Sequence, residues 1–402
     1  MIYKRTINDE IIKFIDLDEI IVLHGARQVG KTHILLWFEN YLKEKKEDVY
    51  YIDLEDSRNK KILDAGVVEF IDHLKEEGHT PNNENKIFVF IDEIQYLENP
   101  SEFLKLIVDH HKNIKLIVSG SSSFAIKSKF KDSLAGRTVN FEIFNLSFAE
   151  YLKFKNYHYD SAVKTSEKKY GELKLLYKDY VLFGGYPKIA LTDETELKEK
   201  RLQQIIDTYV KKDIKELANI DNVENFNKLL EILAAQSGQL ANIKELAATC
   251  KLSVPTIEKY LFILEETYII KLVRPHSGNI RSEISKMPKI FFYDSGLMQM
   301  LWLKSLQKEI IGNVFETSVF SELVKRYKRE NIYYWRTKDK KEIDFIIKDK
   351  NKIIPMEVKI NFKNASLSAI RYFMENYKLN DYRVIGLDDR ENKKGYVYPW
   401  EL

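Results

Sequence analysis

The segment that most constrains the fold is the eight-residue stretch 25–32, which reads Gly-Ala-Arg-Gln-Val-Gly-Lys-Thr. It matches the pattern G-x-x-x-x-G-K-[ST], in which the lysine reaches the β- and γ-phosphates of a nucleotide and the hydroxyl binds Mg²⁺. The glycines let backbone N–H groups approach phosphate oxygens, and a helix beginning at the lysine points its positive end at them. The alternative is a turn that only caps a helix. The predicted phosphate site comprises Gly25, Ala26, Arg27, Gln28, Val29, Gly30, Lys31 and Thr32, with Thr32 as a Mg²⁺ ligand and Arg27 as a residue that could only brace the loop.

The residues around this loop alternate between strand and helix patterns. Short apolar runs at 20–24, 49–54, 87–91 and 114–118 predict strands, and apolar residues at helical spacing between 32 and 43 predict a helix. Strands separated by helices form parallel β-α-β units whose sheet is covered on both faces. We therefore expect an α/β domain up to residue 148, with the glycine loop after its first strand.

Polar residues after later strands of this domain are candidates for catalysis. Asp92 could hold Mg²⁺ and Glu93 could orient or deprotonate the attacking water, unless the pair only marks where a strand leaves the core. Ser119 and Ser121 could sense the γ-phosphate or form a serine-rich turn. Arg137 could supply charge to the transferred phosphoryl group, in cis or from a neighbouring subunit, or could be a surface arginine after a tight turn.

The rest of the chain divides by pattern into three further parts. Residues 149–235 show helical patterns without a clear strand, and a Gly-Gly-Tyr-Pro sequence at 184–187 interrupts them. Residues 236–290 contain two short helix patterns joined by a turn and followed by a strand pattern, which predicts a winged helix-turn-helix. Residues 291–402 return to an α/β pattern.

These motifs resemble those of an AAA+-type ATPase family of bacteria and archaea, in which an AAA domain is joined to a DUF4143-type C-terminal region. The resemblance covers nearly the whole chain and is carried by segments 24–32, 51–56, 90–95, 119–122, 134–137, 183–187, 342–345 and 357–359. It implies a P-loop NTPase (AAA+-like) parallel sheet in residues 1–148 with a helical lid in 149–235. It also implies that the nucleotide is ATP and that the protein hydrolyses it.

A second candidate site lies near the C-terminus. Asp344 and Glu357 fall on two consecutive predicted strands, and period-two alternation places Lys359 on the same side as Glu357. Glu316, on the preceding helix, could add a third carboxylate. Carboxylates can bind Mg²⁺ beside a phosphodiester while a lysine stabilises charge. The pattern resembles that of PD-(D/E)XK nucleases and predicts a restriction-endonuclease-like domain in residues 291–402; the alternative is a solvated strand pair in a domain that only binds.

The net charge of the chain does not decide between a DNA partner and a protein partner. The chain has 64 Lys and Arg against 61 Asp and Glu, a net charge of +3, and acidic residues in the predicted recognition helix would repel DNA phosphates. One hypothesis is an ATP-driven enzyme that acts on DNA through the winged helix and the nuclease-like domain. The other is a nucleotide-operated switch, or a scaffold without turnover, that binds a protein partner and has an inactive nuclease-like domain. A homo-oligomer is compatible with either.

The expected location follows from two absences in the sequence. The single cysteine, Cys250, cannot form an internal disulfide, which fits a reducing compartment. No apolar signal segment opens the chain, and no window of 18 residues is apolar and uncharged. We therefore expect a cytoplasmic protein that does not interact with membranes.

Overall fold

The computed structural model describes the chain except residues 1, 81–85, 121–133, 161–165, 215–219, 221, 277–286, 351 and 391, and the side chains of residues 211–213. The chain forms two compact units, Met1–Phe144 and Asn145–Leu402. The predicted site residue Ser121 lies outside the described residues. No helix in the described parts is long and apolar enough to cross a membrane.

The first unit is built on a parallel sheet of five strands in the order β2-β3-β4-β1-β5. The strands are β1 (Ile20–His24), β2 (Asp48–Asp53), β3 (Ile87–Asp92), β4 (Ile114–Gly120) and β5 (Thr138–Glu142). The first four lie within two residues of the predicted bounds, whereas the apolar pattern did not predict β5. Because β2 and β5 lie on opposite sides of β1, the strand order reverses there. Such a reversal opens a crevice at the carboxyl ends of the strands.

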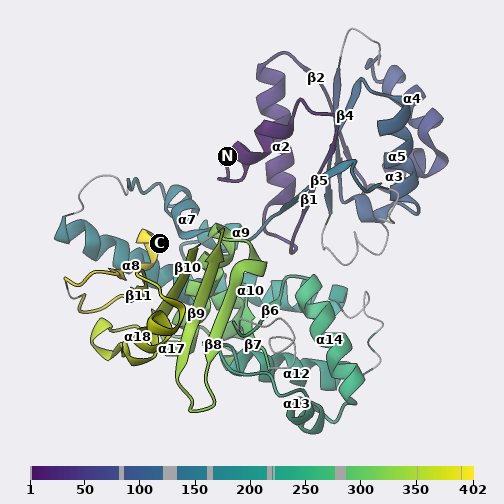
Figure 1. The fold of residues 1–402 in the computed structure, drawn as a ribbon. Coiled ribbons are helices and arrows are strands. Elements are labelled where there is room, and N and C mark those ends of the chain that lie inside the picture. The colour runs from purple at the N-terminus through teal and green to yellow at the C-terminus, as the bar shows by residue number, and fades with distance from the viewer. Residues whose placement is uncertain are drawn as a thin grey trace. The chain divides into compact units, whose positions relative to one another are not determined.

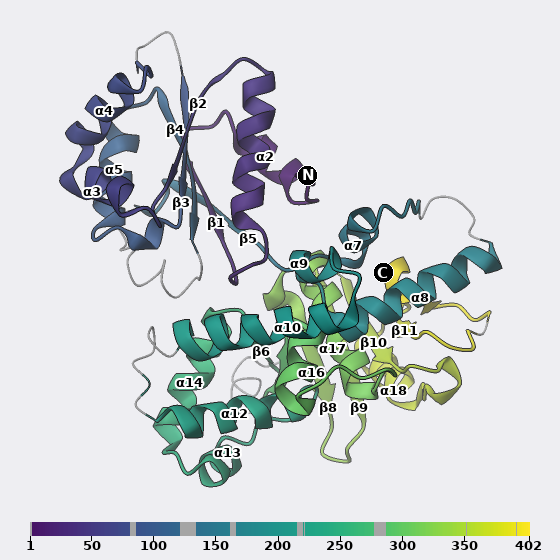
Figure 2. The same ribbon diagram turned by 180° about the vertical axis from the view of Figure 1, so that it is seen from behind.

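Helices cover both faces of this sheet (Figure 1), and the view from behind shows the same layers (Figure 2). Helix α2 (Lys31–Glu44) lies on one face. The opposite face carries α3 (Ser57–Ala65), α4 (Val67–Glu76) and α5 (Pro100–His110). Short helical segments are α1 (Asn8–Ile11), Ile12–Phe14 and Ile94–Tyr96. Every residue of β3 and β4 is buried, as expected for parallel strands covered on both sides. These layers confirm the predicted α/β class.

The second unit begins with helices only, as far as residues 145–235 are described. They are α7 (Phe148–Phe154), α8 (Glu167–Phe183), α9 (Pro187–Ala190), α10 (Thr195–Ile205), the π-helix η4 (Ile206–Asp213) and α12 (Val223–Ala235). The helices predicted to form a lid thus belong to the same compact unit as the C-terminal sheet. The predicted boundaries near residues 235 and 290 fall inside this unit and stay predictions.

The Gly-Gly-Tyr-Pro sequence marks a joint between distant segments of this unit. Gly184 ends α8 with φ of 80°, and a Cβ there would run into the carboxylate of Asp294. The Gly185 N–H donates to Asp294 Oδ2 (2.8 Å). Asp294 also accepts the Leu297 N–H (2.8 Å) and so caps α16 (Ser295–Leu303). The glycines therefore let the end of α8 approach the start of α16.

Two helices and a hairpin follow α12. Helix α13 (Ile243–Cys250) and helix α14 (Val254–Glu266) are joined by a turn in which Lys251 is left-handed, and Ser253 caps α14. Strand β6 (Ile270–Val273) pairs antiparallel with β7 (Lys289–Phe292), which the sequence pattern did not predict. The order is compatible with a winged helix, which stays a prediction.

The chain ends in a second five-stranded sheet, in the order β12-β11-β10-β9-β8. Its elements are α17 (Gly312–Arg326), β8 (Ile332–Arg336), β9 (Glu342–Asp349), β10 (Lys352–Val358), α18 (Ser368–Tyr377), β11 (Arg383–Ile385) and β12 (Tyr396–Val397), with single helical turns at Arg329–Asn331, Phe362–Asn364 and Pro399–Glu401. Strands β8, β9 and β10 are antiparallel, whereas β10, β11 and β12 are parallel. Helix α18 packs Ile370 and Phe373 against Ile343 and Ile346.

Candidate functional site

The glycine loop connects the end of β1 to the start of α2, as its predicted role requires. A Cβ at Gly25 would run into the carbonyl of Ile143, so no larger residue fits there. Gly30 adopts φ of 99° immediately before α2. This left-handed conformation strains any residue with a side chain, whereas glycine adopts it freely. Both glycines thus shape a loop whose amides can face a phosphate chain.

Lys31 is buried inside this loop. Its Nζ donates to the carbonyl oxygens of Gly25 (3.1 Å) and Ala26 (2.8 Å). Burial lowers the pKa of Lys31, and the negative charges of Glu93 and Asp92 oppose that shift. The ammonium group is therefore held at the loop by main-chain carbonyls and faces two carboxylates.

Asp92, at the end of β3, collects hydrogen bonds from three neighbouring segments. Its Oδ2 accepts from the Thr32 hydroxyl (2.6 Å) and the Tyr51 hydroxyl (2.9 Å). Its Oδ1 accepts from the Ser119 hydroxyl and from the Glu93 N–H (3.1 Å). Burial, followed by the charge of Asp92, raises the pKa of Tyr51. The contact between Thr32 and Asp92 joins a hydroxyl to a carboxylate, which is a donor set that suits Mg²⁺.

Glu93 is held in a defined orientation beside Asp92. Its backbone is left-handed, with φ of 56°, and its N–H also contacts Ser119 Oγ (3.2 Å). The side-chain amide of Gln95 donates to the Glu93 carboxylate. Burial and the charge of Glu93 raise the pKa of Glu55, while Arg27 opposes that rise. A non-glycine residue held in a left-handed conformation is frequent at functional sites.

Two residues of this site were missed by the sequence reasoning. Tyr51 lies on β2, the strand next to β3, so knowledge of the strand order would have placed Tyr51 beside Asp92. Arg5 donates to the carbonyls of Val29 (2.9 Å) and Phe144 (3.0 Å), and so ties the loop to the segment after β5. Arg5 has no sequence signal, because it precedes the first strand and belongs to no motif.

Arg137 is not at the phosphate loop of its own chain, which corrects the expectation that it could act in cis. The Ile20 N–H donates to its carbonyl (2.8 Å), so Arg137 lies where β1 begins, whereas the loop follows the other end of β1. Five residues of strand span roughly 16 Å. The Arg137 guanidinium pairs with Asp109 at 2.8 and 3.2 Å. A role across a subunit interface stays a prediction.

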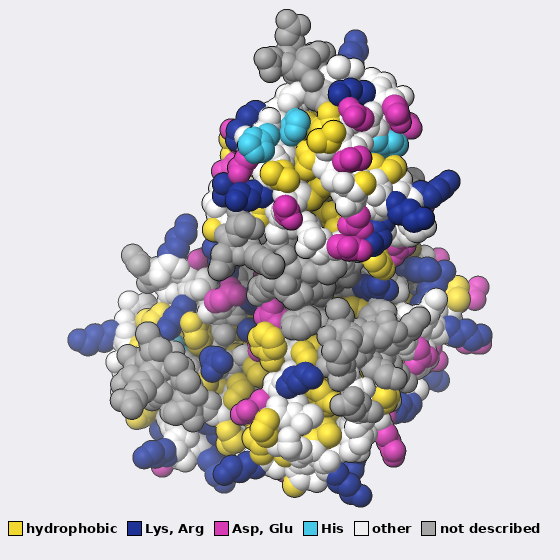
Figure 3. All heavy atoms as spheres, turned by 90° about the vertical axis from the view of Figure 1, so that its right-hand side faces the viewer, with side chains coloured by type: hydrophobic (Ala, Val, Ile, Leu, Met, Phe, Trp, Pro, Cys, Tyr) yellow, Lys and Arg dark blue, Asp and Glu magenta, His cyan; other side chains and the backbone are white. Residues whose placement is uncertain are grey.

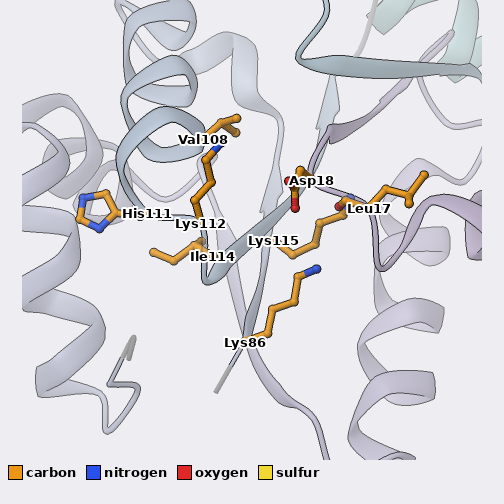
Figure 4. Close-up of a pocket in the computed structure, with 8 residues that line it drawn as sticks. All are labelled: Leu17, Asp18, Lys86, Val108, His111, Lys112, Ile114 and Lys115. Atoms are coloured by element: carbon orange, nitrogen blue, oxygen red, sulfur yellow. The ribbon is translucent and has the colours of Figure 1, made fainter. Parts of the chain in front are cut away.

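A small pocket near this start of the strands collects three lysines, Lys86, Lys112 and Lys115 (Figure 4). Lys115 Nζ donates to the carbonyls of Phe14 (2.8 Å), Leu17 (2.6 Å) and Glu19 (2.5 Å). The cavity has about 10 Å³, which is space for no more than one water molecule. The ammonium group of Lys115 therefore binds main-chain carbonyls, and this pocket is too small to hold a nucleotide.

The second candidate site brings Asp344, Glu357 and Lys359 together. Lys359 Nζ lies 2.8 Å from Glu357 Oε1 and 3.4 Å from Asp344 Oδ2. Asp344 Oδ2 also accepts the Val358 N–H of β10 (2.8 Å). Burial and the charge of Asp344 raise the pKa of Glu357 to about 7. Burial would lower the pKa of Lys359, but the two carboxylates outweigh it and the pKa is raised.

Glu316 lies beside this cluster and contacts a residue that the sequence reasoning missed. Burial and the charge of Asp344 raise the pKa of Glu316 to about 8. Lys289 Nζ lies 3.7 Å from Glu316 Oε1 and 2.6 Å from Glu342 Oε1. Lys289 could not be found from the sequence because β7 was not predicted.

A metal site of three ligands does not form in this arrangement. Among the described residues, no group of three or more His, Cys, Asp or Glu side chains is placed to hold a metal ion. The carboxylates at Asp344 and Glu357 suit Mg²⁺ in chemistry, but both are engaged by the ammonium group of Lys359. The cluster as it stands does not fit a resident metal.

Comparison with known families assigns three regions. Residues 17–152 match an AAA domain family, residues 174–308 match a domain of unknown function, DUF8612, and residues 311–401 match the domain of unknown function DUF4143. The two outer matches confirm the resemblance inferred from the motifs.

Whole-length relatives are uncharacterized proteins. One from Methanocaldococcus jannaschii is 29% identical and covers 99% of this chain and 91% of the relative. One from Haemophilus influenzae is 28% identical and covers 94% and 92%. Among solved structures, Drosophila ORC bound to DNA has a TM-score of 0.32 at 12% identity, covering 71% of this chain and 91% of that chain. AMPPCP-bound DnaA from Aquifex aeolicus has a TM-score of 0.27 at 17% identity, covering 64% and 86%.

Proposed function

We propose that this chain, which matches an AAA domain family in residues 17–152 and DUF4143 in residues 311–401, binds ATP at residues 25–32 and hydrolyses it. One observation carries the proposal. Thr32, Asp92 and Ser119 form a single hydrogen-bonded group at the carboxyl ends of parallel strands, next to the buried ammonium group of Lys31. A loop of amides, one ammonium group and an oriented carboxylate are what phosphoryl transfer to water needs.

Each residue has a separate role in this proposal. The loop amides and Lys31 bind the β- and γ-phosphates and stabilise the charge that develops on them. Glu93 orients the attacking water and accepts its proton. Thr32 and Asp92 would hold Mg²⁺, which supplies charge neutralisation between the phosphates. Ser119 keeps Asp92 and Glu93 in place.

Two substitutions test the binding and the hydrolysis separately. Lys31→Ala should abolish ATP binding in calorimetry, because the loop loses its cation. Glu93→Gln should keep ATP binding but lower kcat at least about 100-fold, the usual contribution of general base catalysis. Glu98→Gln is the matched control, because Glu98 has 75% of its side chain exposed. Undiminished binding by Lys31→Ala, or undiminished turnover by Glu93→Gln, would contradict the proposal.

A second candidate function is metal-dependent cleavage of DNA by the C-terminal domain. The grouping of Asp344, Glu357 and Lys359 at one sheet edge favours it, because two carboxylates and a lysine can act on a phosphodiester. The ion pairs with Lys359 would have to open before either carboxylate could bind a metal ion. Purified protein, DNA and Mg²⁺ or Mn²⁺ should give fragments, and Asp344→Ala should give none. Intact DNA under all conditions, or equal cleavage by Asp344→Ala, would exclude this function.

The alternative is a nucleotide-operated switch that binds a protein partner. The outer face of α14 favours it, since Val254 (38% exposed) and Phe262 (55% exposed) flank Glu258 and Lys259, which offset each other in charge. Basic and acidic side chains are also interspersed on the face drawn in Figure 3. DNA affinity at rising salt discriminates the two functions: a steep loss indicates phosphate contacts, and no binding at low salt leaves the protein partner.

A further inference from the structure

Arg5 ties the phosphate loop to the last residue of the first unit. Arg5 is 7% exposed, and its guanidinium group donates through Nη1 to the Val29 carbonyl (2.9 Å) and through Nη2 to the Phe144 carbonyl (3.0 Å). A guanidinium group is planar and presents its N–H donors in a fixed geometry, so these two contacts hold the two carbonyls at a set separation. Val29 belongs to the loop, and Phe144 ends the first unit.

A second tie joins the start of the loop to the same segment. The Ile143 N–H donates to the His24 carbonyl (2.7 Å), directly before the loop. The backbone of Gly25 approaches the Ile143 carbonyl so closely that it leaves no room for a Cβ. Residues 143 and 144 are therefore tied to the loop at Gly25 and, through Arg5, at Val29. A movement of the loop main chain when its amides bind phosphate has to be accommodated by this segment.

The next two residues are anchored in the second unit. Asn145 is 5% exposed, and its side-chain amide donates to the Asp294 carboxylate (2.5 Å). The Leu146 N–H donates to the Gly185 carbonyl (2.7 Å), and the Leu146 carbonyl accepts from Lys325 Nζ (2.7 Å). These contacts belong to the joint between α8 and α16. Since residues 144 and 145 are consecutive, a single peptide bond connects the two anchored segments.

A direct connection of this kind transmits a movement that a flexible linker would absorb. The peptide bond is planar, so only the dihedrals of Phe144 and Asn145 can absorb a displacement there. Contacts on both sides oppose such rotations, because Arg5 holds the Phe144 carbonyl and Asp294 holds the Asn145 side chain. A ligand shifts a conformational equilibrium only through contacts that differ between the conformations. The loop amides supply such contacts, since they are the groups that a phosphate chain would bind.

We propose that Arg5 couples the phosphate loop to the second unit, so that a nucleotide bound at residues 25–32 stabilises the joint formed by Asn145, Gly185 and Asp294. The inference rests on the proposed ATP site and adds a route by which occupancy of that site reaches the rest of the chain. Arg5 is a positioning residue, because it acts through the main chain of the loop and of the junction and does not touch the nucleotide.

Hydrogen–deuterium exchange of the full chain, measured by mass spectrometry with and without saturating AMPPCP and Mg²⁺, tests the inference. AMPPCP should slow exchange in the loop peptide. It should also slow exchange in peptides that cover Gly185 and residues 294–297 at least about fivefold, the lower end of the usual coupling between two sites. Arg5→Met should keep the slowing at the loop and lose it at the joint. Lys4→Met is the matched control and should keep both effects, since Lys4 pairs with Asp9 and has 47% of its side chain exposed.

Calorimetry of AMPPCP binding to the same proteins separates this inference from the ATP site on which it rests. Equal slowing at the joint in Arg5→Met and in the unsubstituted chain would overturn the inference. Slowing at the loop alone in the unsubstituted chain would also overturn it and leave the ATP site in place. No binding of AMPPCP would refute the ATP site and the inference together. If Arg5→Met does not fold, Asn145→Ala carries the same expectation, because it removes the anchor in the second unit and leaves the contacts of Arg5 with Val29 and Phe144 in place.

Discussion

Asp92 illustrates how a single carboxylate organises the nucleotide site. Both of its oxygens accept hydrogen bonds, and the donors come from α2, β2 and β4 as well as from the next residue in the chain. A carboxylate held on both oxygens keeps one orientation, so a metal ion or a water molecule beside it meets a preformed site. The charge of Asp92 also faces the buried ammonium group of Lys31.

Ser119 should be a positioning residue rather than a structural one. It is fully buried, donates to Asp92 and accepts the Glu93 N–H. A hydrogen bond to a charged group contributes about 1.5–3 kcal/mol, so Ser119→Ala should lower kcat for ATP roughly 10- to 100-fold. KM should change little, because Ser119 is not expected to touch the loop-bound phosphates. Steady-state kinetics measure the split.

The control for this prediction is Ser101→Ala, which removes a buried hydroxyl from α5. Ser101→Ala should affect stability only and leave kcat unchanged. If Ser119→Ala lowers the melting temperature while kcat and KM both stay unchanged, the serine only stabilises the end of β4.

At the scale of elements, the sequence predicted what depends on local pattern and missed what depends on pairing. Strand β3 and the loop before α2 were recognisable because a continuous apolar run and a glycine spacing are both local signals. Strand β5 was missed because it is short, contains only two strongly apolar residues, Val139 and Phe141, and has its position fixed by pairing with β1. Strand β7 has a continuous apolar run, Ile290 to Phe292, but it falls on the predicted boundary near residue 290 and was missed there, and Lys289 was missed with it.

The candidate sites divide in the same way. Lys31, Thr32 and Asp92 could be predicted because each belongs to a motif with fixed spacing after a strand. Tyr51 and Arg5 could not, since their roles follow from strand order and from a contact between distant segments. Arg137 belongs to a recognisable motif, but only the fold shows that Arg137 lies beside the first residue of β1, whereas the phosphate loop follows the last.

The joint between α8 and α16 yields a prediction about glycine. Gly184→Ala should destabilise the second unit by about 2 kcal/mol or more, because Ala at φ of 80° is strained and its Cβ collides with Asp294. Gly171→Ala is the matched control in the same helix, where a Cβ meets nothing within 4 Å. It should stabilise the helix by about 0.5–1 kcal/mol. Urea unfolding measures both, and equal effects would refute the role of the joint.

At the scale of the whole molecule, buried tyrosines predict how the second unit responds to alkali. Burial raises the pKa of Tyr177, Tyr180 and Tyr186 well above 10.0. A folded pKa above the unfolded value contributes stability that is complete below pH 10 and is lost as the pH rises further. Above pH 10, each such tyrosine should lower the free energy of unfolding by about 1.4 kcal/mol per pH unit.

Unfolding followed by tryptophan fluorescence between pH 8 and 11 tests this expectation. Trp37 is the one tryptophan of residues 1–144, so Trp37→Phe makes the signal specific to the second unit. The free energy of unfolding of Tyr177→Phe should fall less steeply with pH, by the contribution of about one proton. Stability that stays constant to pH 11 would show that these hydroxyl groups ionise without unfolding.

The position of Arg137 has a consequence for subunit assembly. Since Arg137 lies at the opposite end of β1 from the loop of its own chain, any action on a bound phosphate has to come from a neighbouring subunit.

Lys31→Ala leaves Arg137 intact but loses the ATP site, whereas Arg137→Ala keeps the site and loses the arginine. Each variant alone should hydrolyse ATP at least about 100-fold more slowly than the unsubstituted chain, as expected for loss of a charge that stabilises phosphoryl transfer. A mixture of the two should recover activity above the sum of the separate rates, because mixed assemblies contain sites with both residues. The recovery should increase with total protein concentration. Additive rates at every mixing ratio would show that Arg137 does not act across an interface, and its pair with Asp109 would then be a contact within its own unit.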